Sequence, residues 1–317
     1  MEKEMKCLTE ICFVLSEEYR TPKREQEVSE TKRGLETEGK RVRILEPPRQ
    51  EETEDGLRLP EGKETYGEIL YLADSALLFQ KLSRQNLCCV GYLHDGNRDV
   101  QFEGAPYLIE QPQEVDVDSY EKIWQRLSHL PWTIAVTERL VIREMVAEDL
   151  EDLYLLYEDP EARKFLEPPS ADREKEAAIL SSYIEKVYPF YGCGMWAVCD
   201  REDGRMIGRV GFEPYRGAGE AVDFGYLIRR DLRGRGLALE ACRAALAFAG
   251  ESLGMTRIGL HTDSRNRASL ALAERLGFSE EREEGAQNMP VVDGSQKAGI
   301  RYFVKDLSGA EENSYDQ

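Results

Sequence analysis

Apolar positions along the chain recur with strand-like and helix-like periodicities, and these predict two ordered regions. In the first region, residues 68–73 and 87–93 are mostly apolar segments of strand length, and residues 76–83 between them have helical spacing. Residues 102–109 add a third strand and residues 119–130 a second helix. A strand, a helix and a further strand in succession are typical of a small βαβ module, which we place at residues 65–132.

The second region, residues 135–307, mixes both periodicities. A strand pair at 195–199 and 206–213 is joined by the turn Asp203-Gly204, and Gly254 and Gly277 stand where helices are expected to end. The further strands are expected at 140–143, 222–228, 257–262 and a closing hairpin that ends at 302–305, and the helices at 147–158, 172–188, 237–252 and 267–276. The fold class is therefore α/β, with a mixed, largely antiparallel sheet flanked by helices.

The two ends of the chain have no such periodicity. Residues 1–64 are dominated by Glu, Lys, Arg and Thr, a composition that buries too little apolar surface to offset the entropy of ordering. We predict a mostly disordered leader there, with at most a loose helix near residues 5–19, and a disordered tail at 308–317.

Composition narrows the possible partners and the compartment. A net charge of −19 disfavours nucleic acid as a partner, because phosphates are repelled. The chain has no apolar stretch of about 18 residues and no secretory signal pattern, which predicts no membrane association. Seven cysteines, an odd number without a repeated CxxC spacing, favour free thiols in a reducing cytoplasm. The three histidines, His94, His129 and His261, are scattered, so no metal site is predicted.

The most informative segment is residues 225–241. An apolar strand ends at Ile228, and a short Arg/Gly loop with Gly234 and Gly236 opens directly into an Ala/Leu-rich helix. Glycines let the backbone approach a ligand closely, and the amides at a helix N-terminus favour a phosphate. The sequence therefore predicts an anion site here. A second segment, residues 266–278, ends in Leu-Gly-Phe.

Together these segments resemble the GNAT superfamily of acyl-CoA-dependent N-acyltransferases, whose loop Arg/Gln-x-x-Gly-x-Gly/Ala holds the CoA pyrophosphate. Residues 233–238 fit that loop, and Asn266 with residues 276–278 fits the family's last block. Residues 137–143 and 148–150 resemble the opening of the branch that acetylates ribosomal-protein N-termini and small amines. The resemblance covers residues 135–307.

The resemblance implies that acetyl-CoA is the co-substrate and that a primary amine attacks the thioester directly. The acceptor is then a small molecule or a peptide N-terminal amine; its identity and the oligomeric state stay open. The residues expected to contact CoA are Leu227, Ile228, Arg233, Gly234, Arg235, Gly236, Leu237, Ala238, Asn266 and Ser269. Asn266 also suits the cap of the following helix, and Ser269 its first turn.

The proton acceptor is left open among three residues. His261 is a histidine, the residue type that needs least tuning to act as a base, Asp223 lies in the strand before the loop, and Glu213 ends the neighbouring strand. Many family members use a Tyr on the last helix to protonate the departing thiolate, and Ala273 stands at that position. A catalytically silent acyl-CoA sensor is therefore the alternative function.

The βαβ module resembles, weakly, the closing part of haloacid-dehalogenase-like hydrolases. Those enzymes use an Asp nucleophile with a second Asp two positions on, whereas Asp74 is followed at that spacing by Ala76. We therefore expect a degenerate or docking module, with Asp74 as a helix cap, and a bifunctional hydrolase as the remote alternative.

Overall fold

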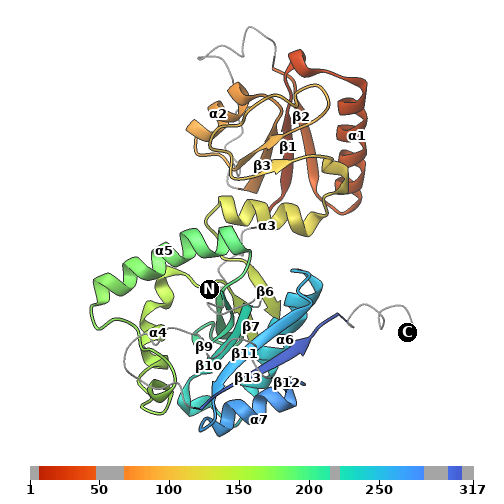
Figure 1. Cartoon of the computed structure of the whole chain (residues 1–317). Helices are drawn as coiled ribbons and strands as arrows, with labels where there is room; N and C mark the ends of the chain where they lie inside the picture. Colours follow the sequence, from red (N-terminus) through yellow and green to blue (C-terminus); the bar gives the residue numbers. More distant parts are fainter. Residues whose placement is uncertain (1–6, 48–67, 215–221, 282–298, 309–317) are drawn as a thin grey trace. The chain divides into compact units, whose positions relative to one another are not determined.

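The computed structural model describes residues 7–47, 68–214, 222–281 and 299–308. The chain divides into two compact units, Met1–Trp132 and Thr133–Gln317, drawn in Figure 1. Each unit has its own sheet, and the two are described separately below.

The first unit is a five-stranded sheet in the order β2-β1-β3-β4-β5, with parallel pairing throughout. The odd-numbered residues of β1 pack against α1 and α3, and the even-numbered ones against α2. The helices therefore cover both faces of the sheet, as Figure 1 shows for α1 and α2. The strands are β1 (Glu10–Val14), β2 (Arg41–Leu45), β3 (Ile69–Ala73), β4 (Cys89–Tyr92) and β5 (Leu108–Ile109), and the helices α1 (Pro22–Thr37), α2 (Ala76–Arg84) and α3 (Val117–Leu127), with short 3₁₀ turns η1 (Glu17–Tyr19) and η3 (Pro112–Glu114).

The prediction of a disordered leader is wrong for residues 7–47, which form β1, α1 and β2. All five residues of β1 are buried between its two neighbouring strands, so the expected loose helix near residues 5–19 is absent from residues 7–19. The buried face of α1 includes Arg24, Glu27 and Thr31, which in sequence look like a solvated surface. Residues 1–6 and 48–64 of that prediction lie outside the described residues.

Asp74 closes a buried polar cluster at the carboxyl end of β3. Its Oδ1 accepts the amide of Ser16 at 2.6 Å, and its Oδ2 accepts Arg24 Nη1 at 2.7 Å. Both charged side chains are almost fully enclosed, with 0% of Asp74 and 1% of Arg24 exposed. Ser75, not Asp74, caps α2, because its hydroxyl accepts the amide of Leu78. The helix-cap role predicted for Asp74 is corrected, and an enclosed, paired carboxylate is unsuited to attack a phosphate ester.

Replacing Asp74 with asparagine is expected to destabilise the first unit strongly. The substitution removes the buried counter-charge of the Arg24 guanidinium and leaves only the half-exposed Glu46 at 3.9 Å; breaking a buried ion pair typically costs about 3–5 kcal/mol of unfolding free energy. Urea unfolding of the full chain, followed by circular dichroism, measures the effect. Asp95→Asn is the matched control, because Asp95 bonds Thr21 nearby but has 37% of its side chain exposed. Equal unfolding midpoints for both variants would refute the role of the pair.

The second unit is an eight-stranded sheet in the order β12-β13-β11-β10-β9-β8-β7-β6. Its pairs are antiparallel except β10 with β11. Its elements are β6 (Thr133–Val136), β7 (Leu140–Arg143), η4 (Ala147–Asp149), α4 (Leu150–Leu156), η5 (Ala162–Lys164), α5 (Arg173–Tyr191), β8 (Met195–Asp200), β9 (Met206–Pro214), β10 (Val222–Ile228), η6 (Arg230–Leu232), α6 (Leu237–Glu251), β11 (Arg257–Asp263), α7 (Arg267–Arg275), β12 (Ser279–Glu281) and β13 (Ile300–Asp306). This is the mixed, largely antiparallel α/β sheet that the sequence predicts.

Helices cover both faces of this sheet. Leu227 of β10 belongs to the core formed with α4 and α5, which includes Leu153 and Leu180. On the other face, the rings of Trp196 and Phe248 meet edge to face, with centroids 5.5 Å apart, which joins β8 to α6. Figure 1 shows α4 and α5 on one side of the sheet and α6 on the other. The alternation of faces along β10 therefore assigns each of its side chains to one layer.

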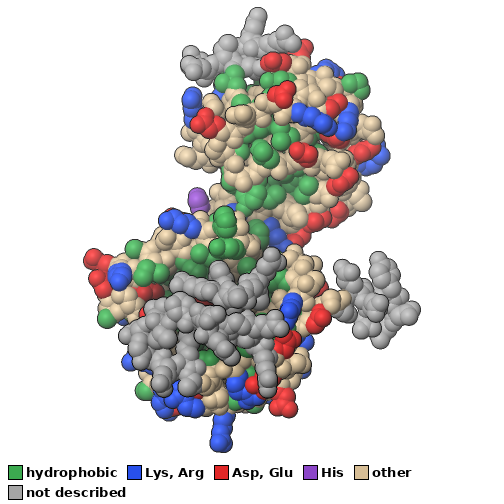
Figure 2. Space-filling view, viewed as in Figure 1, with side chains coloured by type: hydrophobic (Ala, Val, Ile, Leu, Met, Phe, Trp, Pro, Cys, Tyr) green, Lys and Arg blue, Asp and Glu red, His purple; other side chains and the backbone are tan. Residues whose placement is uncertain are grey.

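In the view of Figure 2, no large surface patch of the described residues carries charges of only one sign. Acidic and basic side chains are interspersed over both units there. Among the helices of the described ranges, none combines the length and the apolar content that a bilayer crossing requires.

Candidate active site

The centre of the second unit is a fork between β10 and β11. Along β9, β10 forms seven register pairs, from Val222–Pro214 to Ile228–Gly208. Along β11, the described residues give it a single register pair, Asp223–Gly259. Beyond Asp223 the two strands therefore separate, and one edge of β10 is open to an extended ligand. We call this junction, with Asp223 and Gly259 at its base, the fork.

The fork brings the predicted base candidates together. Asp223 Oδ1 lies 3.0 Å from the backbone nitrogen of His261 and 3.0 Å from His261 Nδ1. The Asp223 carboxylate thus accepts the backbone N–H of His261. In a longer parallel β10–β11 ladder that N–H would instead donate to a backbone carbonyl of β10. Glu213 is the cross-strand partner of Asp223, so the three side chains share one face of the sheet. Sequence reasoning listed them as rivals, whereas the structure joins His261 and Asp223.

The Gly loop, residues 233–236, follows β10 and η6 and leads into α6. Gly234 and Gly236 both have positive φ, +78° and +84°. Gly236 is the N-cap of α6, and no side chain caps that helix end. The first amides of α6 therefore have no side-chain cap and are oriented as donors that an anion could accept, in the left-handed loop geometry that glycine permits.

Arg233 holds this loop in place rather than facing outward as a free cation. Its Nε donates to the Ile228 carbonyl at 2.8 Å, and its Nη1 donates to Asp159 Oδ2 at 2.6 Å. Burial raises the pKa of Asp159, but hydrogen bonds from the Glu161 amide and Arg233 outweigh it and leave that pKa below its usual value. Arg235 is exposed and makes one long bond, 3.3 Å, to the Asp231 carbonyl. Of the two arginines predicted to contact CoA, Arg233 bonds a carboxylate, whereas Arg235 bonds a backbone carbonyl.

Arg139 provides a second tie to the loop. Its Nη1 donates to the Arg235 carbonyl at 2.9 Å, while its Nε donates to Glu240 Oε2 at 2.7 Å. Burial raises the pKa of Glu240, but hydrogen bonds from Thr137 and Arg139 more than offset this and hold the pKa below its usual value. Glu240 therefore stays ionised at neutral pH and fixes Arg139 against the loop.

Replacing Arg139 with methionine is expected to weaken acetyl-CoA binding about tenfold, the equivalent of ~1.4 kcal/mol, because the Arg235 carbonyl loses its donor and the loop gains freedom. Calorimetric titration with acetyl-CoA measures the effect. Arg201→Met is the control, since Arg201 Nη1 donates to the Thr137 carbonyl at 3.0 Å and not to the loop carbonyl of Arg235. Equal affinities of the two variants would show that the tie is irrelevant to binding.

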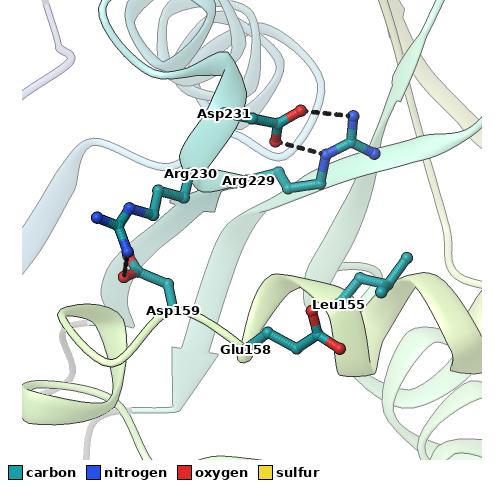
Figure 3. Close-up of a pocket in the computed structure, with 6 residues that line it drawn as sticks. All are labelled: Leu155, Glu158, Asp159, Arg229, Arg230 and Asp231. Carbon is teal, nitrogen blue, oxygen red and sulfur yellow. Dashed lines mark hydrogen bonds and ion pairs between the residues drawn. The ribbon is translucent and has the colours of Figure 1, made fainter.

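A pocket of about 610 Å³ lies beside the carboxyl end of β10. It is lined by Leu155, Glu158, Asp159, Arg229, Arg230 and Asp231 (Figure 3). Arg229 bonds Asp231 at 2.8 Å and 3.1 Å, and Arg230 lies 3.6 Å from Asp159. Both lining arginines are thus balanced by carboxylates.

The remaining predicted CoA contacts divide between core and helix cap. The side chains of Leu227, Ile228 and Leu237 are buried, with at most 8% exposed, so only their backbone can meet a ligand. Asn266 caps α7, since its Oδ1 accepts the Ser269 amide at 3.1 Å. Ala238, next to Leu237 in the first turn of α6, is half-buried.

Sequence reasoning missed Tyr226, which lies on the α6 and α7 side of β10. Burial raises its pKa to about 12, and a side-chain hydrogen bond with Ser269 acts in the opposite direction. Ser269 is thereby tied to β10 across the fork, so it is already engaged within the protein. The position of Ser269 within residues 266–278 did not indicate that Tyr226 would be its partner.

No group of three or more His, Cys, Asp or Glu side chains that could hold a metal occurs in the described ranges. All seven cysteines are free thiols, and five of them are buried: Cys12, Cys89, Cys193, Cys199 and Cys242. Burial raises the pKa of Cys242, so this thiol stays protonated.

Comparisons with known proteins agree with this geometry. Residues 139–279 match a family model described as "Acetyltransferase (GNAT) domain". The chain is 26% identical over 162 residues to the uncharacterized protein YkkB of Bacillus subtilis, covering 50% of this chain and 93% of that protein. It is 28% identical over 156 residues to the putative ribosomal N-acetyltransferase YdaF of Bacillus subtilis, covering 47% and 83%. It is 29% identical over 177 residues to the ribosomal protein uS5-alanine N-acetyltransferase of Escherichia coli, covering 53% and 88%.

Proposed function

From the premise that residues 139–279 form a GNAT acetyltransferase domain, we propose that this chain transfers the acetyl group of acetyl-CoA to a primary amine by direct attack on the thioester. One observation carries the proposal. The open edge of β10 leads from the N-terminus of α6 to the His261–Asp223 pair, which joins an anion site to a base.

The residues of this region fit acetyl-CoA as co-substrate. The pyrophosphate would meet the uncapped amides of α6, which the Gly loop leaves accessible. The amide-bearing pantetheine arm can add to the open edge of β10 like a further strand, because its amides match backbone donors and acceptors. A ligand laid this way brings its thioester to the base of the fork, beside Asp223.

Within this proposal His261 is the general base and Asp223 its positioning partner. When Nδ1–H donates to the Asp223 carboxylate, the imidazole lone pair lies on Nε2, which takes the proton from the attacking amine. The carboxylate also stabilises the imidazolium that forms. The amine nitrogen forms the C–N bond, and the C–S bond breaks with its electron pair remaining on the CoA sulfur.

The acceptor is a cationic amine in this proposal. Glu213 is exposed opposite Asp223, so two carboxylates face the place where an ammonium group must be held before it loses its proton. Two of the relatives carry names that refer to ribosomal N-acetylation, which favours a protein N-terminal amine over a free small amine.

A transfer assay tests the proposal directly. The full chain is incubated with acetyl-CoA and a panel of peptides with free N-termini, polyamines and amino acids, and free thiol release is measured. Steady turnover with one amine class is the expected result. Binding of acetyl-CoA without transfer to any amine would favour the silent sensor, for which the buried Ala273 in place of a Tyr is the supporting observation.

A further inference from the structure

Tyr302 lies at the base of the fork. It is the register partner of His261 on the neighbouring strand β13, so the two side chains lie on the same face of the sheet. The two rings stack with centroids 4.6 Å apart and planes inclined by 27°. A phenol is thus placed beside the proposed base by β13, an element for which the motifs gave no role.

Gly259 shows where the Tyr302 phenol reaches. A Cβ atom added at Gly259 would stand 2.9 Å from Tyr302 Cε2 and 3.1 Å from its hydroxyl oxygen. The ring therefore occupies the space that any larger residue would need. Since Gly259 is the register partner of Asp223, one strand spacing away, the Tyr302 hydroxyl lies within about 8 Å of the last paired position of β10.

That is also where the acetyl donor ends under the proposed function, on which this inference rests. The phosphates lie at α6, so the thioester of a ligand on the open edge of β10 reaches the Asp223–Gly259 level. The position on α7 from which family members are expected to supply a phenol is Ala273, which is fully buried and has no proton to give.

We propose that Tyr302 protonates the departing CoA thiolate. As the tetrahedral intermediate collapses, the C–S electron pair stays on sulfur, and the Tyr302 O–H proton transfers to it to give the thiol. His261 holds the proton taken from the amine and releases it to solvent, and the Tyr302 phenolate regains a proton from solvent. The sum is acetyl-CoA plus amine giving amide plus CoA thiol.

The test compares Tyr302→Phe with Tyr302→Leu. Phenylalanine keeps the ring over Gly259 and against His261 and removes only the hydroxyl, whereas leucine removes the stacking as well. We expect Tyr302→Phe to lower kcat about 100-fold, within the usual range for loss of a general acid, with unchanged calorimetric affinity for acetyl-CoA. We also expect it to abolish the alkaline decline of the pH profile of kcat.

The outcomes separate this inference from the proposed function. If the unmodified chain acetylates an amine and Tyr302→Phe retains kcat within threefold, while only Tyr302→Leu loses it, the residue acts through stacking and the inference is overturned. If the unmodified chain acetylates no amine in the panel, the proposed function fails first and this assignment fails with it. A large loss in Tyr302→Phe with the alkaline decline intact would also overturn it.

Discussion

Replacing Gly236 with valine is expected to lower the affinity for acetyl-CoA by on the order of 100-fold, equivalent to ~2.7 kcal/mol. Gly236 has φ +84° at the N-cap of α6, a conformation that a β-branched residue adopts only with strain. The chain relieves that strain by moving the loop, which misdirects the α6 amides and narrows the approach of a phosphate. Calorimetric titration with acetyl-CoA is the measurement.

Gly204→Val is the matched control for this prediction. Gly204 has φ +72° with nothing within 4 Å of an added Cβ, and it lies in the turn between β8 and β9. The substitution imposes similar backbone strain away from the α6 N-terminus, so it should lower thermal stability comparably and leave acetyl-CoA affinity intact. Equal affinity losses in the two variants would mean that Gly236 matters only through stability.

Replacing His261 with alanine is expected to lower kcat by about 10²–10⁴-fold, the usual contribution of a general base, with little change in acetyl-CoA affinity. The substitution removes the proton acceptor but leaves the Gly loop and the open edge of β10 in place. Stopped-flow measurement of thiol release at saturating acetyl-CoA and amine reports the effect, and calorimetry reports binding.

Two carboxylate variants separate the roles at the fork. Asp223→Asn is expected to lower kcat strongly as well, because an amide can present its NH₂ to His261 Nδ1 and favour the wrong tautomer. Glu213→Gln is expected to raise the KM for the amine and leave kcat within a few-fold, because Glu213 contributes attraction rather than proton transfer. Unchanged kcat in both His261→Ala and Asp223→Asn would remove the dyad from the mechanism.

The sequence predicts the second unit well because its local signals agree. The strand ending at Ile228, the positive-φ glycines 234 and 236, and the helix from Leu237 each have a short-range physical cause. Boundaries shifted by a few residues where tertiary contacts decide them. The helix expected at 147–158 is a 3₁₀ turn and then α4, which ends at Leu156 before the buried Asp159.

The first unit shows where composition misleads. Residues 7–47 are rich in charge, yet Arg24 and Glu27 are buried there, and Glu27 accepts the Tyr92 hydroxyl at 2.8 Å. Arg24 is paired with Asp74, fifty residues away in sequence. Charged side chains indicate a solvated surface only when their partners are absent, and those partners come from distant strands that no local pattern reveals.

The side-chain contacts of the candidate site were equally hidden from the sequence. Arg233 is paired with Asp159, 74 residues earlier, and His261 with Asp223, 38 residues earlier. Tyr302 reaches Gly259 through β13, which follows a long connection. A motif specifies the backbone that holds a cofactor, whereas the roles of individual side chains depend on which strands become neighbours.

The central claim is that the open edge of β10 and the N-terminus of α6 bind acetyl-CoA. Calorimetric titration of the full chain with acetyl-CoA, desulfo-CoA and ADP tests it most directly. The account predicts saturable binding of both CoA compounds with dissociation constants between about 1 μM and 1 mM, the range of ordinary substrate constants, and much weaker binding of ADP. Absence of binding by acetyl-CoA and desulfo-CoA alike would contradict it, because the Gly loop would then be only a turn between a strand and a helix.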